Sequence, residues 1–374
     1  MSTRQEPIRV AEIIGRMAGG GVETVVTNYY RFIDKSKVQF DFFYFENSVD
    51  EPPADLIAMG ARFYCLPSIK HVSAYCKKLR SIIRENGYSI VHSHLNTLSV
   101  IPLYCAWKEH VPIRIAHNHS VPAGKELRGV LKKFLRLFSK TFATDYAACS
   151  EAAGRWLFGN KTYDAGKVTV FANAIDYDRY KKDPEARGNI RSRYHIAPGT
   201  VVMGHVGRFT YAKNHEFLIS IFNQYHKNHP ESVLLLTGDG ERRAEIENMI
   251  RSHHLDSCTI MTGEVHDVEN YLNAMDVFVM PSRYEGLPTA AIEAQACQLP
   301  IVVSDVVPRA AAITNEIQFL PISAPVDQWN RAINISMHRE IHFNSNKDNY
   351  DIHSACRILE EWYLNRLEEY SDGH

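Results

Sequence analysis

The sequence predicts an α/β protein built from two doubly wound domains, each with a parallel sheet covered by helices on both faces. The chain has 374 residues, more than one ordinary hydrophobic core accommodates. Short apolar runs alternate with amphipathic helical patterns along its whole length, which is typical of βαβ units. The runs fall into two successive series, so we expect two sheets.

The first series predicts strands at residues 8–14, 38–45, 90–95, 113–117 and 168–171, with helices at 23–32 and 73–84. The second predicts strands at 201–207, 233–237, 259–262, 277–280 and 301–304, with helices at 216–225 and 241–250. A polar stretch at 172–193 is expected to join the series. Residues 351–370 predict a long closing helix. The expected domains are 1–175 and 176–350, with segment 351–374 packing back on the first.

Composition excludes several function classes. Apolar residues make up 45% and charged residues 23%, as in globular proteins, and the net charge of −1 gives no field that would attract nucleic acid. Seven scattered cysteines without a Cys-x-x-Cys pair fit free thiols in a reducing compartment. No apolar run approaches the roughly 20 residues that span a bilayer. We therefore expect a cytoplasmic protein.

Glycines follow the first predicted strand. Gly19, Gly20 and Gly21 stand just before the helix expected from Glu23. Glycine lets the backbone approach a ligand, and a helix start offers unpaired N–H donors to an anion. A simple tight turn is the alternative. The spacing is not that of a dinucleotide fingerprint.

A second anion site is predicted after the first strand of the second series. Arg208 ends that strand and Lys213 opens the next helix. An arginine and a lysine placed in this way can clamp phosphates, with the helix dipole adding to the attraction. Two solvated surface cations are the alternative.

Two carboxylates follow the strand predicted at 277–280. They lie in the string Ser-Arg-Tyr-Glu-Gly-Leu-Pro-Thr-Ala-Ala-Ile-Glu, where Glu285 precedes a Gly-Leu-Pro turn and Glu293 falls inside the following helix. One carboxylate can bind sugar hydroxyls and the other a ribose. Two solvated glutamates are the alternative, but the apolar residues between them argue against a solvated face.

Histidines end two neighbouring strands of the first series. His117 and His119 follow one strand, and either could orient a reacting sugar. His92 and His94 share one face of the strand before it. They either support the site or are ordinary histidines near the core.

Two further segments are weighed for function. Asp176-Tyr177-Asp178 matches a short metal-binding string, but it has no further ligand nearby, so we expect a structural role, such as capping a short helix, and no metal site. The segment from Leu127 to Lys140 predicts a basic amphipathic helix. Its apolar stripe either packs on its own domain or contacts an anionic membrane or lipid diphosphate.

Taken together, these motifs resemble family 4 of the retaining GT-B glycosyltransferases, in the branch for bacterial exopolysaccharide or capsule synthesis. The resemblance covers nearly the whole chain. It is carried by the segments at 20–23, 117–119, 149–154, 173–176, 207–209 and 238–240, and by the two glutamates with seven residues between them.

The resemblance implies two Rossmann-like domains that face each other across a cleft, and transfer with retention and without a metal or other cofactor. Arg208 and Lys213 would hold the donor diphosphate, Glu285 the hexose and Glu293 the ribose. Other donor contacts, and the active-site histidine, would come from further positions: Gly20, Gly21, Val265, Leu287, Pro288, Thr289, and His119 or His117.

Three departures from the family pattern stand out. Ala172-Asn173-Ala174 replaces Pro-Asn-Gly, Gln298 replaces a frequent glycine, and Val-Val-Pro-Arg follows Asp305 in place of a Gly-Gly segment ending in glutamate. Because of this third departure, the sequence does not predict which residues of this segment would contact phosphate.

The expected function is transfer of a hexose or N-acetylhexosamine from a nucleotide-sugar, a UDP-sugar by preference, to an acceptor that is either a saccharide or, by preference, a saccharide linked to polyprenyl diphosphate. The enzyme would work in the cytoplasm, with peripheral contact at the inner face of the plasma membrane through the segment at 127–140. A UDP-sugar 2-epimerase and a non-catalytic partner subunit of a transferase are the alternatives.

Overall fold

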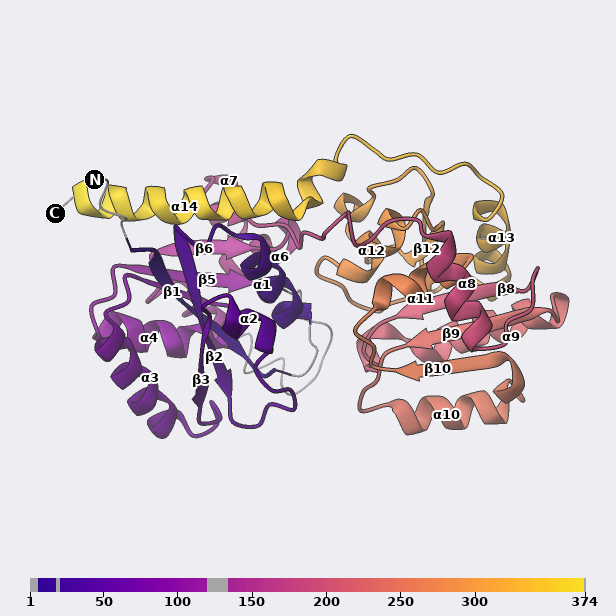
Figure 1. Cartoon of the computed structure of the whole chain (residues 1–374), viewed down its shortest axis with the longest axis horizontal. Coiled ribbons are helices and arrows are strands. Elements are labelled where there is room, and N and C mark those ends of the chain that lie inside the picture. The colour runs from indigo at the N-terminus through magenta and orange to yellow at the C-terminus, as the bar shows by residue number, and fades with distance from the viewer. Residues whose placement is uncertain (1–5, 18–20, 120–133, 373–374) are drawn as a thin grey trace. The chain divides into compact units, whose positions relative to one another are not determined.

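The computed structural model describes residues 6–17, 21–119 and 134–372, which divide into two compact units. The first unit contains residues 1–174 and 349–374, and the second contains residues 175–348. Each is an α/β unit with its own parallel sheet (Figure 1). The predicted fold class is therefore confirmed.

The described residues of the first unit form a seven-stranded sheet in the order β3-β2-β1-β4-β5-β6-β7, with every pair parallel. Its strands are β1 (Ile8–Gly15), β2 (Val38–Phe45), β3 (Arg62–Leu66), β4 (Ile90–Ser93), β5 (Ile113–Asn118), β6 (Asp145–Ala148) and β7 (Val168–Val170). Parallel strands need crossover connections, and helices supply them. The helical segments are α1 (Gly21–Phe32), α2 (Ala54–Ala58), α3 (Val72–Asn86), η1 (Asn96–Ser99), α4 (Val100–Lys108), α6 (Glu151–Phe158) and α7 (Asn160–Asp164).

Local sequence explains where several helices begin and end. Ser150 caps α6 by accepting a hydrogen bond from the Ala153 amide at 3.3 Å. Gly87 ends α3 in the left-handed region, with φ of 63°. In the second unit, Asp183 caps α8 (Pro184–Arg193), and Pro184 occupies the first turn.

The closing helix α14 (Ile352–Asp372) belongs to the first unit and lies beside α1 (Figure 1). Ile352, Leu359 and Tyr363 are buried in the same apolar cluster as residues of β1 and β2. The side chain of Tyr363 thereby reaches the middle of the first sheet, 351 positions from its hydrogen-bond partner Glu12.

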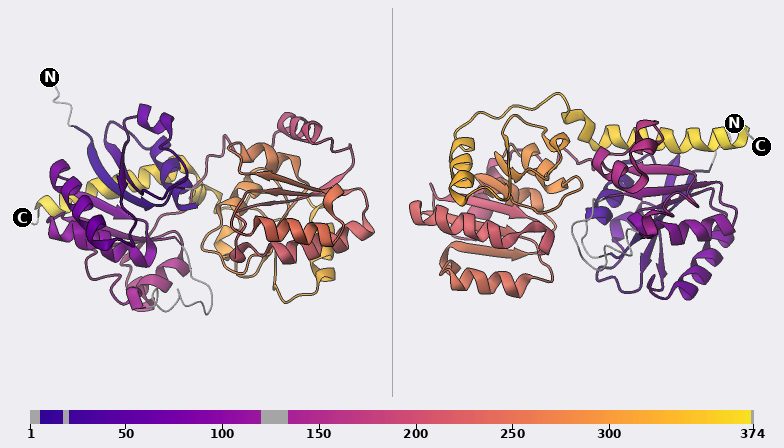
Figure 2. Two further views of the ribbon diagram at one scale, coloured as in Figure 1. Left: turned by 90° about the horizontal axis from the view of Figure 1, so that it is seen from below. Right: turned by 180° about the vertical axis from the view of Figure 1, so that it is seen from behind.

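The described residues of the second unit form a six-stranded parallel sheet (Figure 2). The strand order is β10-β9-β8-β11-β12-β13. Its strands are β8 (Val201–Val206), β9 (Ser232–Thr237), β10 (Thr259–Gly263), β11 (Val277–Met280), β12 (Ile301–Ser304) and β13 (Ile317–Leu320). Besides α8, its helical segments are η2 (Tyr211–Lys213), α9 (His215–Asn228), α10 (Arg243–Ser252), η3 (Asp256–Cys258), α11 (Val268–Ala274), α12 (Thr289–Ala296), η4 (Arg309–Ala311) and α13 (Val326–Ser336), and η5 (Lys347–Tyr350) follows at its end.

The structure differs from the sequence prediction in three strands and in the expected linker. Strands β3, β6 and β13 are not predicted, since each is short and includes a charged or amide side chain. The stretch expected to be a linker contains α8, where Arg187 and Arg191 bind the carboxylate of Asp276 at 2.6 Å each. Tertiary ion pairs thus hold a helix whose sequence has almost no apolar face.

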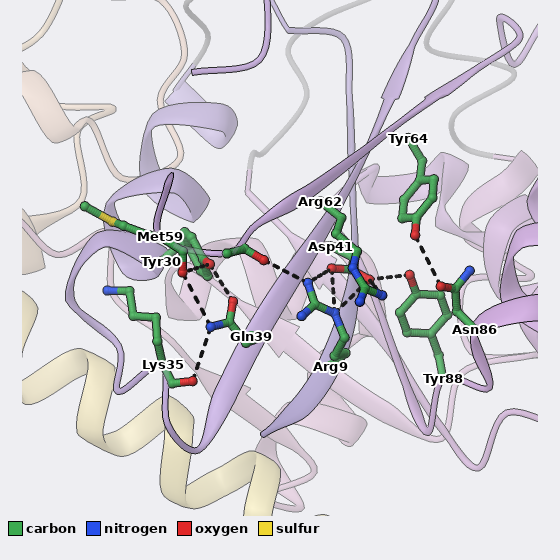
Figure 3. Close-up of polar contacts among 11 residues, drawn as sticks. Arg9, Tyr30, Lys35, Gln39, Asp41, Met59, Arg62, Tyr64, Asn86 and Tyr88 are labelled. Carbon is green, nitrogen blue, oxygen red and sulfur yellow. Dashed lines mark hydrogen bonds and ion pairs between the residues drawn. The ribbon is translucent and has the colours of Figure 1, made fainter. Parts of the chain in front are cut away.

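A buried ionic cluster ties β1 to β2 in the first unit (Figure 3). Asp41 is fully buried and accepts hydrogen bonds from Arg9 Nε, at 2.9 and 3.1 Å, and from the Tyr88 hydroxyl at 2.5 Å. The charge of this carboxylate is therefore balanced by a neighbouring guanidinium.

Candidate active site

The loops that follow β8 and β9 are joined by backbone hydrogen bonds. The amide of Phe209 donates to the Asp239 carbonyl at 2.8 Å, and the amide of Gly207 donates to the Thr237 carbonyl at 3.0 Å. A Cβ on Gly240 would lie 2.6 Å from the Phe209 carbonyl oxygen, closer than real Cβ atoms come. Glycine at this position lets the two backbones touch, and the contact fixes the loop that follows β8.

Arg208 is the exposed member of the predicted clamp. Its side chain is 47% exposed, and the carboxylate that approaches it, on Glu241, lies 3.8 Å away and is itself 63% exposed. A long ion pair between solvated groups contributes little stability. The guanidinium is therefore available to an anionic ligand at small cost.

Lys213 and Glu285 are brought together by the fold. Lys213 Nζ lies 2.8 Å from Glu285 Oε1, with side-chain exposures of 20% and 9%. Asn214, whose φ is 57°, donates from Nδ2 to the Pro281 carbonyl at 2.9 Å and so ties η2 to the loop after β11. A cation and a carboxylate predicted from separate motifs thus lie side by side at one end of the second sheet.

A group of residues without a recognisable motif supports the clamp. Glu216 accepts from Arg242 Nη1 at 2.9 Å and from Arg283 Nη2 at 3.1 Å. Arg283 also donates to the Tyr211 carbonyl at 2.8 Å and lies 4.2 Å from the centre of its ring. These contacts hold η2, which ends in Lys213. Arg283 stands next but one before Glu285 in the sequence, but nothing in the sequence points to its partner Glu216.

Glu293 lies inside α12 and is 6% exposed, so it does not lie on a solvated face. Burial raises its pKa to about 7, against the opposing effects of a hydrogen bond from Tyr180 and the charge of Arg179. Arg179 in turn binds Glu269 at 2.8 Å. Glu293 is therefore a carboxyl group whose protonation changes near neutral pH.

The remaining donor-site predictions of the second unit lie around α12 and after β10. Leu287 is buried, Pro288 precedes the helix and Thr289 begins it, with no side-chain cap on the first turn. Val265 is half-buried, two residues after Gly263, whose φ is 75°. The ligand contacts expected of these residues stay predictions.

In the first unit, His117 lies near the end of β5, His119 follows the strand directly, and both are buried. Their rings stack with centroids 4.0 Å apart. His92 Nε2 lies 3.0 Å from His117 Nδ1, and His94 Nδ1 lies 2.8 Å from His119 Nε2. His92 and His94 are therefore buried histidines that also contact the predicted site residues.

Some predictions fall wholly or partly outside the described residues. Gly20 and residues 127–133 are among these, while Gly21 is the exposed first residue of α1. The helix predicted as far as Lys140 ends at Arg136, because the amides of Leu137 and Phe138 bond to carbonyls three residues back and form turns. Phe134 and Leu137 are exposed. No described helix is long and apolar enough to cross a membrane.

Asp176 has a structural role. Its Oδ1 accepts from the amide of Asp178 at 2.9 Å, which caps a turn and not the short helix that was expected.

Comparison with known proteins agrees with this geometry. Residues 186–350 match the family model described as "Glycosyl transferases group 1", and residues 19–179 match "Glycosyltransferase Family 4". EpsF of Bacillus subtilis (strain 168), described as a glycosyltransferase, is 33% identical over 332 residues, which are 87% of this chain and 86% of EpsF.

Two more distant proteins extend the comparison. An Escherichia coli UDP-Gal:alpha-D-GlcNAc-diphosphoundecaprenol alpha-1,3-galactosyltransferase is 23% identical, over 84% of each chain. The crystal structure of Anabaena HepE in complex with UDP and glucose shares the fold, with a TM-score of 0.73, 16% identity, and coverage of 98% of this chain and 99% of that one. The fold is therefore GT-B, and the chain belongs to the glycosyltransferases, in family 4 of that class.

Proposed function

We propose that this glycosyltransferase moves a hexose or N-acetylhexosamine from a UDP-sugar to a saccharide linked to polyprenyl diphosphate, with retention of configuration and without a metal, in exopolysaccharide or capsule synthesis. The observation that carries the proposal is the grouping of Arg208, Lys213 and Glu285 around β8 and β11. The diphosphate-linked acceptor of the Escherichia coli relative supports the acceptor class. The HepE complex supports the donor class.

The two cations would act on the leaving group. As the bond between sugar and phosphate breaks, negative charge grows on the UDP oxygens, and cations already in place stabilise that charge. Lys213 would exchange its contact with Glu285 for one with phosphate, which leaves Glu285 Oε1 to accept from a hexose hydroxyl. The incoming hydroxyl would attack on the face that the phosphate leaves. Two fixed cations would supply what a divalent metal supplies in other transferases.

Glu293 would bind the ribose. A carboxylate accepts from two neighbouring hydroxyls, and the burial of Glu293 excludes competing water. One of the two stacked histidines, His119 by preference, would contact the sugar. Peripheral membrane contact through the segment at 127–140 is part of the same proposal and rests on the exposed Phe134 and Leu137.

A ligand screen tests the donor class. A ligand that binds the folded state raises the unfolding temperature by an amount set by its affinity and concentration. UDP-sugars should protect the protein more than GDP- or TDP-sugars, with and without a chelator. If only GDP-sugars protect the protein, the donor is a GDP-sugar and not a UDP-sugar. If protection requires a divalent ion, the metal-free mechanism is wrong. Conversion of UDP-N-acetylglucosamine without acceptor would favour the epimerase, and no protection by any donor would favour the non-catalytic subunit.

A further inference from the structure

Glu12, in the middle of β1, is the meeting point of two chains of hydrogen bonds inside the first unit. In one chain, Glu12 Oε2 lies 2.7 Å from His94 Nε2, and His94 Nδ1 lies 2.8 Å from His119 Nε2. In the described part of the protein, the far nitrogen of that chain, His119 Nδ1, is buried and has no hydrogen-bond partner.

The second chain leaves Glu12 from its other oxygen. The Tyr363 hydroxyl donates to Glu12 Oε1 at 3.0 Å and lies 2.6 Å from His92 Nδ1. His92 Nε2 lies 3.0 Å from His117 Nδ1. The far nitrogen here is His117 Nε2, which is also buried and without a partner among the described residues.

The surroundings of Glu12 differ from those of Asp41, the buried carboxyl that is paired with Arg9 (Figure 3). For Glu12, which is 1% exposed, no lysine or arginine of the described residues lies within ion-pair distance, and the titratable groups beside it are the rings of His92 and His94 and the Tyr363 hydroxyl. Burying a carboxylate without a cation is costly, so the group should hold a proton. Burial raises the pKa of Glu12 and lowers the pKa of His94 to about 3.

The proton of Glu12 sets the direction of the chain through His94, and the Tyr363 hydroxyl, which donates to Glu12 Oε1, sets the direction of the other chain. The Tyr363 hydrogen is given to Glu12 Oε1, so Tyr363 can only accept from His92 Nδ1–H, and His92 Nε2 accepts from His117 Nδ1–H. His117 Nε2 is then a bare acceptor. The proton of the acid lies on the other oxygen and is given to His94 Nε2.

In the first chain the direction is the reverse. His94 Nδ1–H donates to His119 Nε2, and the hydrogen of His119 must then lie on Nδ1. The result is the same if the proton crosses from Glu12 to His94, because His94 Nδ1 keeps its hydrogen.

We propose that Glu12 and His94 are positioning residues that make His119 a hydrogen-bond donor through Nδ1–H, while Tyr363 and His92 make His117 an acceptor through Nε2. All four rings then carry their hydrogen on Nδ1. The two chain ends offer one donor and one acceptor, the combination that a hydroxyl group satisfies. A cavity of about 20 Å³ lies beside the rings, but it exposes only apolar surface and is not the site of that hydroxyl. It is lined by the four histidines, Glu12 and Tyr363 together with Val25, Val26, Tyr29, Phe40, Phe171 and Leu359.

The inference rests on the proposed function in one respect, the placing of His119 at the reacting sugar. There the Nδ1–H would donate to an oxygen of the donor sugar. The tautomers themselves are independent of that role and can be measured without substrate.

Long-range ¹H–¹⁵N correlation spectra of protein labelled with ¹⁵N-histidine report which ring nitrogen carries hydrogen. Single His→Gln variants would assign the four rings. The expected result is an N–H at Nδ1 for His92, His94, His117 and His119, all neutral at pH 7. Hydrogen on Nε2 of His94 and His119 would show an ionised Glu12 and overturn the proposal. Hydrogen on Nε2 of His92 and His117 would mean that Glu12 donates its proton to Tyr363 and not to His94. That result would also overturn the proposal.

Glu12→Gln is the sharpest variant, because an amide can accept from Tyr363 and donate to His94 as the protonated acid does. In Glu12→Gln, the ring hydrogens of His94 and His119 should stay on Nδ1. The kcat of this variant should be at least tenfold above that of Glu12→Leu. Tyr363→Phe is the matched control, because it breaks the other chain of hydrogen bonds. In this variant the ring hydrogen of His119 should stay on Nδ1. A kcat of E12Q as low as that of E12L, in folded proteins, would overturn the positioning role. The expected tautomers together with full turnover of His119→Gln would refute the proposed site and leave the tautomer assignment standing.

Discussion

The ends of the two parallel sheets carry polar groups of opposite character. In the second unit they are charged and partly solvated, as in Arg208 and the Lys213–Glu285 pair. In the first unit they are uncharged rings, buried and joined by hydrogen bonds to Glu12. The same fold thus builds two kinds of site.

The difference fits the roles proposed for the two sites. A solvated cation can exchange partners at small cost, which suits a group that binds and releases a diphosphate. A buried hydrogen-bond network is costly to rearrange and holds each ring in one orientation, which suits the recognition of a fixed hydroxyl. On the proposed function, the exposed cations of the second unit would bind the diphosphate, and the rigid rings of the first unit would recognise the hydroxyl.

The largest expected effect is the fall in kcat/KM when either cation of the clamp is removed. Arg208→Ala and Lys213→Ala should each lower kcat/KM at least 100-fold, about 3 kcal/mol of transition-state stabilisation, because charge on the leaving phosphate is then unmatched. Steady-state transfer assays measure this. Arg251→Ala, which removes an exposed arginine of α10, is the control and should change kcat/KM less than twofold. Ordinary turnover in either clamp variant, with the fold intact, would refute the assignment.

The next effect concerns Glu293, the buried acid of the second unit. The pKa of Glu293 in the folded state, about 7, lies above its ordinary 4.5. Between these values the folded state binds more protons than the unfolded state, so this group's contribution to stability falls as pH rises from 4.5 to 7 and then stays constant. Glu293→Gln should be roughly 3 kcal/mol more stable than the unsubstituted protein at about pH 8 and equally stable near pH 4. Urea unfolding at the two pH values measures this. A difference that does not vary with pH would contradict the buried, raised-pKa assignment.

A smaller effect is expected where the loops of the second unit touch. Gly240→Ala would place a Cβ 2.6 Å from the Phe209 carbonyl oxygen and force the Arg208 loop to shift. We expect a loss of about 2 kcal/mol in the free energy of unfolding, together with reduced transfer. Unchanged stability and activity would show that this contact does not fix the loop.

The smallest effect has the opposite sign. Gly188 lies within α8, and an added Cβ would meet nothing within 4 Å. Gly188→Ala should raise the free energy of unfolding by about 0.5–1 kcal/mol, because alanine loses less backbone freedom in a helix. Thermal unfolding measures the stability of both Gly188→Ala and Gly240→Ala. It thereby compares a glycine with free space around its Cα with one whose added Cβ would collide with backbone. Destabilisation of Gly188→Ala would mean that α8 is strained.

The sequence predicts the fold where local pattern decides it. Strands β11 and β12 begin and end as predicted, because each is an apolar run bounded by polar residues or turns. Strand β2 does so too, because its eight residues are mostly aromatic although they include Gln39 and Asp41. Strand β6 is missed because Asp145, Tyr146 and two alanines give no such run. Helix α8 is missed because arginine pairs with Asp276, about 85 positions away, hold it in place.

The same division applies to the sites. Arg208, Lys213 and Glu285 can be selected from the sequence because they follow strands whose ends meet at one edge of a sheet. Glu12 and Tyr363 cannot, since their contact depends on where a helix 351 positions away crosses the sheet. Local motifs identify the groups that are proposed to contact ligands, while the positions of the groups that contact them in turn depend on long-range packing.

The most direct test of the central claim, that Arg208 and Lys213 form a diphosphate site, is calorimetric titration with UDP and with uridine. The unsubstituted protein should bind UDP far more tightly than uridine, and the double variant Arg208→Ala/Lys213→Ala should bind the two equally weakly, with its uridine affinity unchanged. Equal UDP affinity in the two proteins would contradict the diphosphate assignment.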